Sequence, residues 1–418
     1  MNQLRKYLVY ALSIAVLALS ACSGGKLFFQ PRNLVNTYHP RDARPIPNIK
    51  IYHPDDQSTE ISLWYVSNAF IPFINDSLNH IEGIEIKLYP DDNTEAIIEK
   101  SFGLDDLDYT AKQVKASFTF STTPDHNYLA EITTNYHQQS SRRFIRIVRK
   151  GKNLNQFIKI YTKKDSLIAD NHTINLSEKV YFKSNYFTNG EYRVSYFQPF
   201  QEALHPPSAP DSLSKLDEAD STYTTFLNKE EGFTPKREGL YYFTQDDSLQ
   251  NGFSINVFNP FYPDVRTPQA LYEALNYLVD TDTLGEPKNP KEYKLLVDNF
   301  WLERAENIER SRNLIKVYYN RIRYANIFFT SYKKGWKTDR GLIYVMYGLP
   351  DEIYISQNSE KWSYNPSGIN PGLIFNFNIK DHPLTTQHYQ LDREKLKFTN
   401  WDAIQKAWLE GNVIYHQN

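Results

Sequence analysis

Hydrophobic side chains recur at every second position through much of the first half of the chain. Ile61, Leu63 and Tyr65 follow this period, and so do the apolar residues within 84–88, 118–120 and 144–148. A period of two is typical of half-buried β-strands, and clusters rich in Pro, Asp and Asn separate the runs. We therefore predict a β-sandwich-like module of about seven strands over residues 48–150.

Residues 151–262 continue the strand pattern with less regular spacing. The clearest strand candidates are 157–161, 180–182, 192–197, 239–243 and 253–258. Residues 203–236 interrupt them with proline, serine and acidic residues, which bury little apolar surface. We predict a second β module over 151–262 with an exposed loop at 203–236. A binding loop that becomes ordered on a partner is the alternative for that segment.

The hydrophobic period changes to that of a helix near residue 263. Thr267 before Pro268, and Asn289 before Pro290, place a capping residue ahead of a proline at the first helical position. The helical pattern continues to Phe329 with a break near residue 307. Apolar runs at 342–347, 353–355, 362–364 and 373–377 then predict strands, and a short helix begins at residue 401.

These patterns predict a multidomain, mostly β chain. Two β-sandwich-like modules precede an α+β domain at residues 263–418, in which long helices pack on a small antiparallel sheet.

The first residues predict export. Arg5 and Lys6 precede an apolar run at 7–19 that is too short for a stable membrane span. Residues 19–22 (Leu-Ser-Ala-Cys) resemble a bacterial lipobox, so we predict a lipoprotein signal peptide at 1–21 and lipidation of Cys22. A free cysteine after an ordinary signal peptide is the alternative. Prolines and arginines make residues 22–47 a predicted tether.

The residues after Cys22 predict which membrane holds the lipid anchor and which side of it the protein faces. Residues 23–26 (Ser-Gly-Gly-Lys) contain neither an aspartate next to the cysteine nor an acidic cluster, so they resemble neither an inner-membrane retention signal nor a surface-export signal. We predict a lipid anchor in the outer membrane with the protein facing the periplasm. Display on the cell surface is the alternative.

Composition narrows the function classes. A net charge of -2 provides no basic face for nucleic acid. The 31 Tyr and 25 Phe suit strands and cross-strand packing, and they also offer stacking platforms for sugars or peptides. We find no nucleophile elbow, phosphate loop or zinc-binding helix, so we predict no catalytic residue, no metal and no cofactor.

The segment from Gly335 to Glu352 is the most distinctive stretch of the chain. We expect glycines there to permit unusual backbone conformations, Trp336 to anchor the helix end, and Thr338 to cap exposed amides together with Asp339. Arg340 is expected to pair with Asp339 or with a carboxylate of the long helix. The residues with this predicted structural role are Gly335, Trp336, Thr338, Asp339, Arg340, Gly341, Gly348, Pro350 and Asp351.

A binding role for the same segment is the alternative. Asp339, Arg340, Asp351 and Glu352 would then form a polar pocket beside Trp336 and Trp362. Two carboxylates with aromatic rings nearby are typical of a glycosidase or a sugar-binding cleft. The predicted ligand-binding residues of this hypothesis are Asp339, Arg340, Glu352 and Trp362.

Gly335-Trp336, a free position, and Thr338-Asp339 together resemble the signature of the GWxTD family, which is found in exported proteins of Bacteroidota. The resemblance covers about residues 241–364 and is strongest at 299–304, 324–326 and 335–353. It departs from the family pattern at Leu342, where relatives often have arginine, and at Ala305, where they tend to have an acidic residue. The resemblance implies an exported protein and no established activity.

The sequence favours a non-enzymatic function, because modular β domains on a tether, without catalytic motifs, are typical of a scaffold protein. We predict a binding, accessory or scaffold subunit of a cell-envelope assembly, in protein export or outer-membrane insertion, with envelope proteins as partners. The alternative is a glycan-binding or glycan-hydrolysing lipoprotein.

Overall fold

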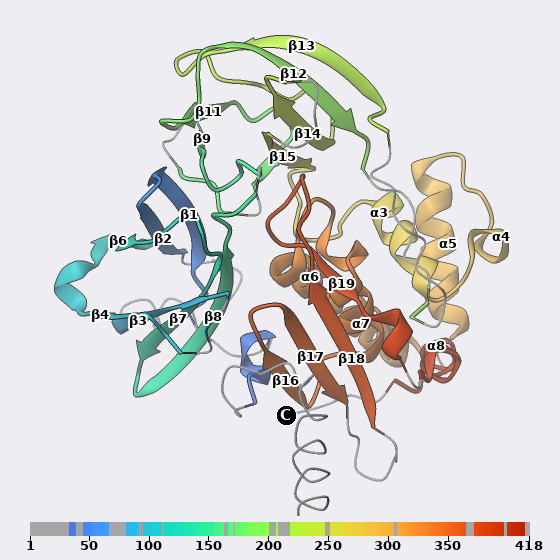
Figure 1. The fold of residues 1–418 in the computed structure, drawn as a ribbon. Helices are drawn as coiled ribbons and strands as arrows, with labels where there is room; N and C mark the ends of the chain where they lie inside the picture. Colours follow the sequence, from blue (N-terminus) through green and yellow to red (C-terminus); the bar gives the residue numbers. More distant parts are fainter. Residues whose placement is uncertain are drawn as a thin grey trace, which may run out of the picture.

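The structure is a computed structural model, and it describes residues 33–38, 45–66, 81–91, 93, 95–110, 113–151, 153–162, 166–170, 172–199, 206–207, 218–246, 251–304, 307–364, 372–396 and 399–413. Figure 1 shows two β-rich bodies followed by a body of helices and one small sheet. The predicted fold class, mostly β with an α+β end domain, is confirmed. Cys22 and the predicted signal peptide lie outside the described residues. Within the described ranges, no helix has the length and apolar character needed to cross a membrane.

The N-terminal module is a sandwich of two antiparallel sheets. One sheet has the order β1 (Asn48–Asp55), β2 (Ser58–Val66), β6 (Gln113–Ser121), β5 (Asp108–Thr110), and the other β4 (Ile98–Phe102), β3 (Ile81–Pro90), β7 (Tyr128–Tyr136), β8 (Gln139–Ile147). A short 3-10 helix, η2 (Leu104–Asp106), lies between β4 and β5. Alternating side chains such as Ile61, Leu63, Ile84 and Ile86 meet in one core between the sheets. The period of two identified β2, β3, β6 and β8, and it is clearest in β6, which buries one face. It does not mark β7, in which side chains on both faces are buried.

The second module has a five-stranded sheet with a two-stranded sheet beside it. The first has the order β10 (Thr173–Asn175), β15 (Gly252–Phe258), β14 (Gly239–Thr244), β12 (Gly190–Phe197), β13 (Ser221–Leu227), and the second pairs β9 (Lys159–Thr162) with β11 (Val180–Lys183). Strand β13 lies inside the segment 203–236, which we predicted to be an exposed loop. That prediction is wrong for residues 221–227, which pair with β12 over the strand's whole length. The strand is mostly exposed at the sheet edge, so it shows no buried apolar stripe.

The C-terminal domain packs helices against one four-stranded sheet. Its helices are α3 (Pro268–Glu273), η3 (Ala274–Tyr277), α4 (Thr281–Leu284), α5 (Pro290–Glu303), α6 (Ile308–Phe329), η4 (Gly335–Lys337), α7 (Asp339–Tyr347), η5 (Arg393–Lys395) and α8 (Trp401–Leu409), and its sheet is β16 (Glu352–Ile355), β17 (Ser359–Tyr364), β18 (Leu373–Ile379) and β19 (Tyr389–Leu391). The side chains of Thr267, Asn289 and Asn307 accept hydrogen bonds from backbone amides at the starts of α3, α5 and α6. These caps satisfy amides that have no partner inside the helix.

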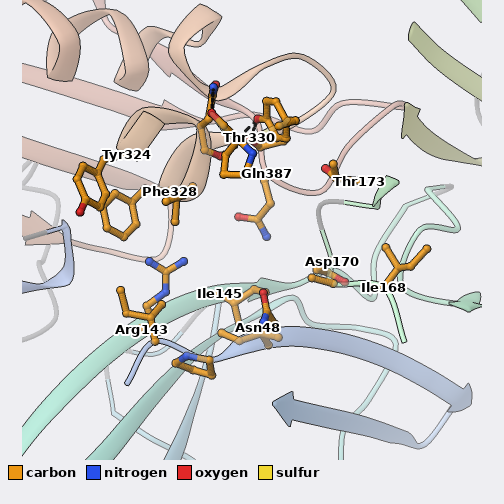
Figure 2. Close-up of a pocket in the computed structure, with 18 of the residues that line it drawn as sticks. Asn48, Arg143, Ile145, Ile168, Asp170, Thr173, Tyr324, Phe328, Thr330 and Gln387 are labelled. Atoms are coloured by element: carbon orange, nitrogen blue, oxygen red, sulfur yellow. Dashed lines mark hydrogen bonds between the residues drawn. The ribbon is translucent and has the colours of Figure 1, made fainter. Parts of the chain in front are cut away.

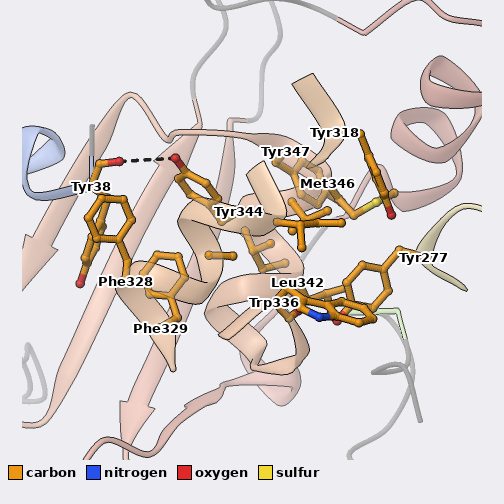
Figure 3. Close-up of a cluster of buried hydrophobic side chains, with 14 of the residues drawn as sticks. Tyr38, Tyr277, Tyr318, Phe328, Phe329, Trp336, Leu342, Tyr344, Met346 and Tyr347 are labelled. Atoms are coloured by element: carbon orange, nitrogen blue, oxygen red, sulfur yellow. Dashed lines mark hydrogen bonds between the residues drawn. The ribbon is translucent and has the colours of Figure 1, made fainter. Parts of the chain in front are cut away.

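Residues 342–347, which we predicted to be a strand, form most of helix α7. The prediction is wrong because every side chain from Arg340 to Tyr347 is buried, so the segment has no polar face to reveal a helical period. Local signals do favour a helix: Thr338 caps its start, and Gly348 ends it with a φ of 85°. Helix α7 lies in the middle of the domain core, where Tyr344 and Met346 pack among aromatic side chains (Figure 3).

Part of the predicted tether 22–47 belongs to the C-terminal domain. The 3-10 helix η1 (Val35–Tyr38) packs on it, and the backbone amide of Leu34 donates to the carbonyl of Ile353 at 2.9 Å. The Tyr38 ring lies 4.9 Å from the ring of Phe329 and 5.9 Å from that of Trp362, centroid to centroid. Residues 33–38 are therefore a fixed part of this core, contrary to the prediction of a tether there.

Candidate functional site

The two glycines of the signature allow close approach between backbones. A Cβ at Gly335 would lie 2.1 Å from the carbonyl oxygen of Ala325 in α6, and a Cβ at Gly341 would lie 1.9 Å from the carbonyl oxygen of Gly335. Neither glycine has a positive φ. Our expectation of unusual backbone conformations is therefore wrong at these two positions. Glycine is needed because α6, η4 and α7 leave no room for a side chain.

Trp336 is held in place by both its ring and its backbone. The ring, 2% exposed, meets the Tyr277 ring edge-on at 5.3 Å. The Tyr277 hydroxyl donates to the Trp336 carbonyl at 2.7 Å, and the Trp336 amide donates to the side-chain oxygen of Asn326 at 3.2 Å. Figure 3 shows the indole against Tyr277 below helix α7. The tryptophan thus joins η3, η4 and α6.

Thr338 and Asp339 make contacts at the start of α7. The Thr338 hydroxyl accepts from the amide of Gly341 at 3.1 Å and donates to the carbonyl of Gly335 at 2.7 Å. Asp339 accepts from the Leu391 amide at 2.8 Å and from the Arg393 guanidinium at 3.0 Å. Both side chains therefore hold α7 against its neighbours.

Arg340 pairs with Glu360 on β17, and not with Asp339 or a carboxylate of the long helix as we expected. Its Nη1 lies 2.9 Å from Oε2 of Glu360 and 3.1 Å from the Tyr38 hydroxyl, and all three side chains are buried. Glu360 also accepts from the indole nitrogen of Trp362 at 2.7 Å. Burial and the charge of Glu360 raise the pKa of Tyr38 well above its usual value. The Tyr38 hydroxyl donates to the same carboxylate at 3.2 Å. A buried carboxylate with these three donors forms a stable link between η1, α7 and the sheet.

The residues of the alternative binding hypothesis do not form one pocket. Trp336 and Trp362 are buried in the core, and Asp339 faces Arg393. Glu352 is on β16, directly opposite Ser363 of β17. Asp351 and Glu352 do not line the large cavity described next. Of the four predicted ligand-binding residues, only Arg340 reaches that cavity.

A cavity of about 760 Å³ lies where the three modules meet. This intermodule cavity is lined by residues including Asn48, Arg143 and Ile145 of the N-terminal sandwich, Ile168, Asp170 and Thr173 of the second module, and Tyr324, Phe328, Thr330 and Gln387 of the C-terminal domain (Figure 2). Its volume is in the range of small-molecule sites, which commonly form at domain interfaces. No single module makes up its wall.

A buried polar network fixes one side of the intermodule cavity. Lys50 of β1 lies 3.6 Å from Asp170, and it bonds the carbonyl of Asn155 at 3.0 Å and Nε2 of His172 at 2.6 Å. Asp170 also accepts from the hydroxyl of Thr386 at 3.3 Å. The network therefore connects all three modules. Burial lowers the pKa of Lys50 to about 8 and that of His172 well below its usual value, and it raises the pKa of Asp170.

Most charges around the cavity are paired. Asp264 lies 2.5 Å from Arg266 and 2.6 Å from Arg323, and Arg340 is paired with Glu360. Arg143 is different, because its Nε and Nη1 are buried and have no hydrogen-bond partner among the described residues. Its guanidinium lies 5.5 Å from the centre of the Phe328 ring, and burial lowers its pKa.

The sequence did not reveal four residues of the cavity and of the buried ion pair: Arg143, Gln387, Tyr38 and Glu360. The one available signal was that Arg143 falls on the period of two with Ile145 and Ile147, so a charged residue occupies a position where the pattern expects an apolar one. Gln387, Tyr38 and Glu360 carry no such signal, since their partners are distant in the sequence. Among the described residues, no group of three or more His, Cys, Asp or Glu is arranged to hold a metal ion.

Comparison with known proteins identifies one part of the chain. The model of the GWxTD domain family matches residues 239–410. The chain carries a GWxTD domain. The matched segment begins at β14, so two strands of the second module's sheet belong to the GWxTD domain together with the helices and the last sheet. The predicted boundary at residue 263 lies inside it.

No curated protein matches the chain. Solved structures with detectable similarity include the GH family 64 laminaripentaose-producing β-1,3-glucanase from Paenibacillus barengoltzii, at 10% identity over 47% of this chain and 46% of the glucanase, with a TM-score of 0.17. They also include a chimeric titin Z1Z2-Z1Z2 tandem, at 11% identity over 51% of this chain and 99% of the tandem, with a TM-score of 0.14. The chain spans about half the length of the glucanase. TM-scores this low carry no information about function.

Proposed function

We propose that this GWxTD-domain protein is a non-enzymatic binding or accessory subunit of a cell-envelope assembly, held at the outer membrane by a lipid on Cys22. The observation that carries the proposal is the intermodule cavity, whose wall comes from all three modules. A partner segment that entered it would contact every module at once, and its binding would then be coupled to their arrangement. That is the property an assembly subunit needs.

The lipobox-like residues 19–22 support the anchor, and the residues that follow them support a periplasm-facing position. A lipid on Cys22 would provide durable attachment while leaving the folded modules in the aqueous phase. The glycan-binding alternative has less support, because Asp339, Glu352 and Trp362 do not share a cleft.

The test is a pull-down of the tagged, full-length protein from its native membrane in mild detergent, followed by mass spectrometry. We expect stoichiometric recovery of other envelope proteins, such as an outer-membrane barrel or further lipoproteins. A Cys22→Ala variant is the control for the anchor, and we expect it to leave the membrane fraction. A protein recovered alone from its native membrane would contradict the accessory role, and glycan-array binding would then be the next measurement.

The membrane side has its own test. Protease added to intact cells should leave a periplasm-facing protein uncut and should digest it after the outer membrane is opened. Digestion in intact cells would place the protein on the cell surface instead.

A further inference from the structure

The intermodule cavity is lined by two guanidiniums, those of Arg143 and Arg340. The charge of Glu360 acts on both, but its carboxylate is hydrogen-bonded to Arg340 and not to Arg143. Arg143 extends from β8 into the cavity toward Phe328 of α6 (Figure 2). Its Nε and Nη1 are buried without an acceptor. A buried guanidinium with unsatisfied N–H groups is unfavourable, because it has lost water and gained no equivalent partner. An anion that entered the cavity would supply the missing acceptors.

Two further donors line the same cavity. Gln387 lines the cavity, and its side-chain nitrogen is buried without an acceptor. Figure 2 shows its side chain extending from the C-terminal domain toward the strands opposite. Nε of Arg340 is also buried without an acceptor, although its Nη1 is bound to Glu360. The unsatisfied groups are thus all donors, and they come from β8, α7 and the segment before β19.

The charges of the lining determine which anion fits. Asp264 is paired with Arg266 and Arg323, Asp170 with Lys50, and Arg340 with Glu360. Asp264 serves two arginines, and Arg143 has no hydrogen-bonded carboxylate, so the lining carries an excess of positive charge and favours an anion. At Arg143 and Gln387 themselves the donors carry one positive charge, which matches a monoanion. A phosphate dianion would bring a second negative charge into a site with low dielectric constant, at a cost in desolvation.

The rest of the wall determines what the anion is attached to. Ile145, Ile168, Tyr324 and Phe328 present aliphatic and aromatic surface beside the donors. Apolar walls with a few directed polar groups are typical of ligand sites, where the polar groups orient the ligand. The ligand should therefore carry an apolar or aromatic group next to its anionic end.

We propose that the intermodule cavity binds the C-terminal carboxylate of a polypeptide with an apolar last residue, with Arg143 and Gln387 as the donors to that carboxylate. The inference rests on the proposed function, since a polypeptide C-terminus is a feature that an envelope protein partner would present. Capture of terminal carboxylates by directed N–H groups is a recurring mode of peptide recognition.

The direct test is isothermal titration calorimetry with the full-length protein in detergent and the probe N-acetyl-Ala-Ala-Phe carrying a free carboxylate. The matched probe is the same peptide with a C-terminal amide. Charge-assisted hydrogen bonds are lost in the amide, so we expect it to bind about ten- to a hundredfold more weakly. Equal binding of acid and amide, or no binding of the acid, would overturn the proposal.

Variants of two adjacent arginines test whether binding depends on Arg143 itself or only on the positive charge of the protein. Arg143→Met should weaken acid binding about ten- to a hundredfold, and Gln387→Leu should weaken it less. Arg142→Met is the control, because Arg142 pairs with Glu131 at 3.5 Å and does not line the cavity. We expect it to bind the acid as the wild type does. Wild-type affinity in Arg143→Met would overturn the assignment.

Folding of the variants is followed by thermal denaturation. Removal of an unsatisfied buried charge should leave the melting temperature of Arg143→Met unchanged or raise it, and the acid peptide should raise the melting temperature of the wild type alone. A lower melting temperature in Arg143→Met, with no effect of peptide on the wild type, would assign Arg143 a structural role with Phe328 and overturn the proposal.

Two other ligand classes are tested in the same titration. Binding of glucuronate, with no binding of the acid peptide, would identify an acidic-sugar site and overturn the peptide assignment. Preferential binding of inorganic phosphate would contradict the monoanion argument.

The fate of the proposed function is measured separately. If the pull-down recovers envelope proteins with both wild type and Arg143→Met while the acid peptide does not bind, the accessory role stands and this inference fails. If the peptide binds but no protein is recovered from the membrane, the site stands and the accessory role fails.

Discussion

The close approach between α7 and η4 leads to a sharp prediction for Gly341→Ala. The new Cβ would lie 1.9 Å from the carbonyl oxygen of Gly335 and 2.8 Å from Cα of Trp336, whereas ordinary contacts lie at 3.4–4 Å. The atoms in the way are backbone atoms, so no side-chain rotation relieves the clash. The two backbones must move apart by about 1.5 Å, the difference between those distances.

The magnitude follows from what this movement breaks. Three hydrogen bonds cross the junction: from Thr338 N–H to the Gly335 carbonyl at 3.1 Å, from the Thr338 hydroxyl to the same carbonyl at 2.7 Å, and from Gly341 N–H to the Thr338 hydroxyl at 3.1 Å. At about 1 kcal/mol each they contribute roughly 3 kcal/mol. Overpacking adds about 1–3 kcal/mol, and the better helix propensity of alanine returns about 1 kcal/mol. We expect a net loss of about 3 kcal/mol or more.

The assay is thermal denaturation followed by tryptophan fluorescence and circular dichroism. Five tryptophans, at positions 301, 336, 362, 401 and 408, lie in the C-terminal domain, so fluorescence reports mainly on it. A loss of 3 kcal/mol corresponds to a melting temperature lower by about 6–12 °C for a domain of this size.

Gly103→Ala, in the N-terminal sandwich, is the control for the change from glycine to alanine itself, and it is followed by circular dichroism. A Cβ at that position meets nothing within 4 Å and the φ is ordinary, so we expect a change within about 0.5 kcal/mol. If Gly341→Ala melts within about 2 °C of the wild type, as Gly103→Ala should, the close-approach explanation of the signature is wrong.

Four further predictions concern the same framework. Trp336→Ala should lower the free energy of unfolding by about 3–5 kcal/mol, because a fully packed indole leaves a cavity; an unchanged melting temperature would refute its structural role. Thr338→Ala should cost about 0.5–2 kcal/mol in urea denaturation, while Thr338→Ser keeps the capping oxygen and should stay close to the wild type. Glu360→Gln should cost about 3–5 kcal/mol, because the buried guanidinium of Arg340 loses its counter-charge; an additive result in the double variant with Arg340→Met would argue against the pairing. Burial lowers the pKa of Lys50 from 10.5 to about 8 in the folded state. Between these two pH values, Lys50 therefore binds more protons in the unfolded chain than in the folded protein. The contribution of Lys50 to the free energy of unfolding should thus rise by about 1 kcal/mol per pH unit in this range. Urea denaturation of wild type and Lys50→Met at pH 8 and pH 10 should show the wild type gaining on the variant, and a constant difference would contradict the shift.

The sequence by itself determined the β modules and most helix starts. Alternation at 61–65 and 84–88 revealed strands, because each strand buries one face and the period is visible within a few residues. Thr267 and Asn289 marked helix starts because a cap bonds to amides two or three positions along. The signature at 335–339 pointed to the GWxTD domain for a similar reason, since all of its members lie within five residues.

Tertiary structure decided the conformation of 342–347 and the position of β13. A helix that is buried on all sides has no polar face, so its period vanishes and its β-branched residues resemble a strand. An exposed edge strand has no apolar stripe, and β13 exists because its backbone pairs with β12. In both cases the deciding contacts come from segments outside the local window.

The candidate site was also decided by the tertiary structure. Arg340 meets Glu360 twenty positions later and Tyr38 three hundred and two positions earlier, and no local spacing predicts either contact. The intermodule cavity brings together β8, residues 166–170 and α6, whose meeting depends on how the modules pack against one another. Tyr89 and Leu129 of the N-terminal sandwich, for example, belong to the core of the C-terminal domain. Arg143 shows the limit most clearly, because its neighbours in sequence identify a strand and only the packing of the modules buries two of its guanidinium nitrogens without a hydrogen-bond partner. Period and capping are local properties that a sequence states directly, whereas a binding site is a set of long-range contacts that exists only after the chain has folded.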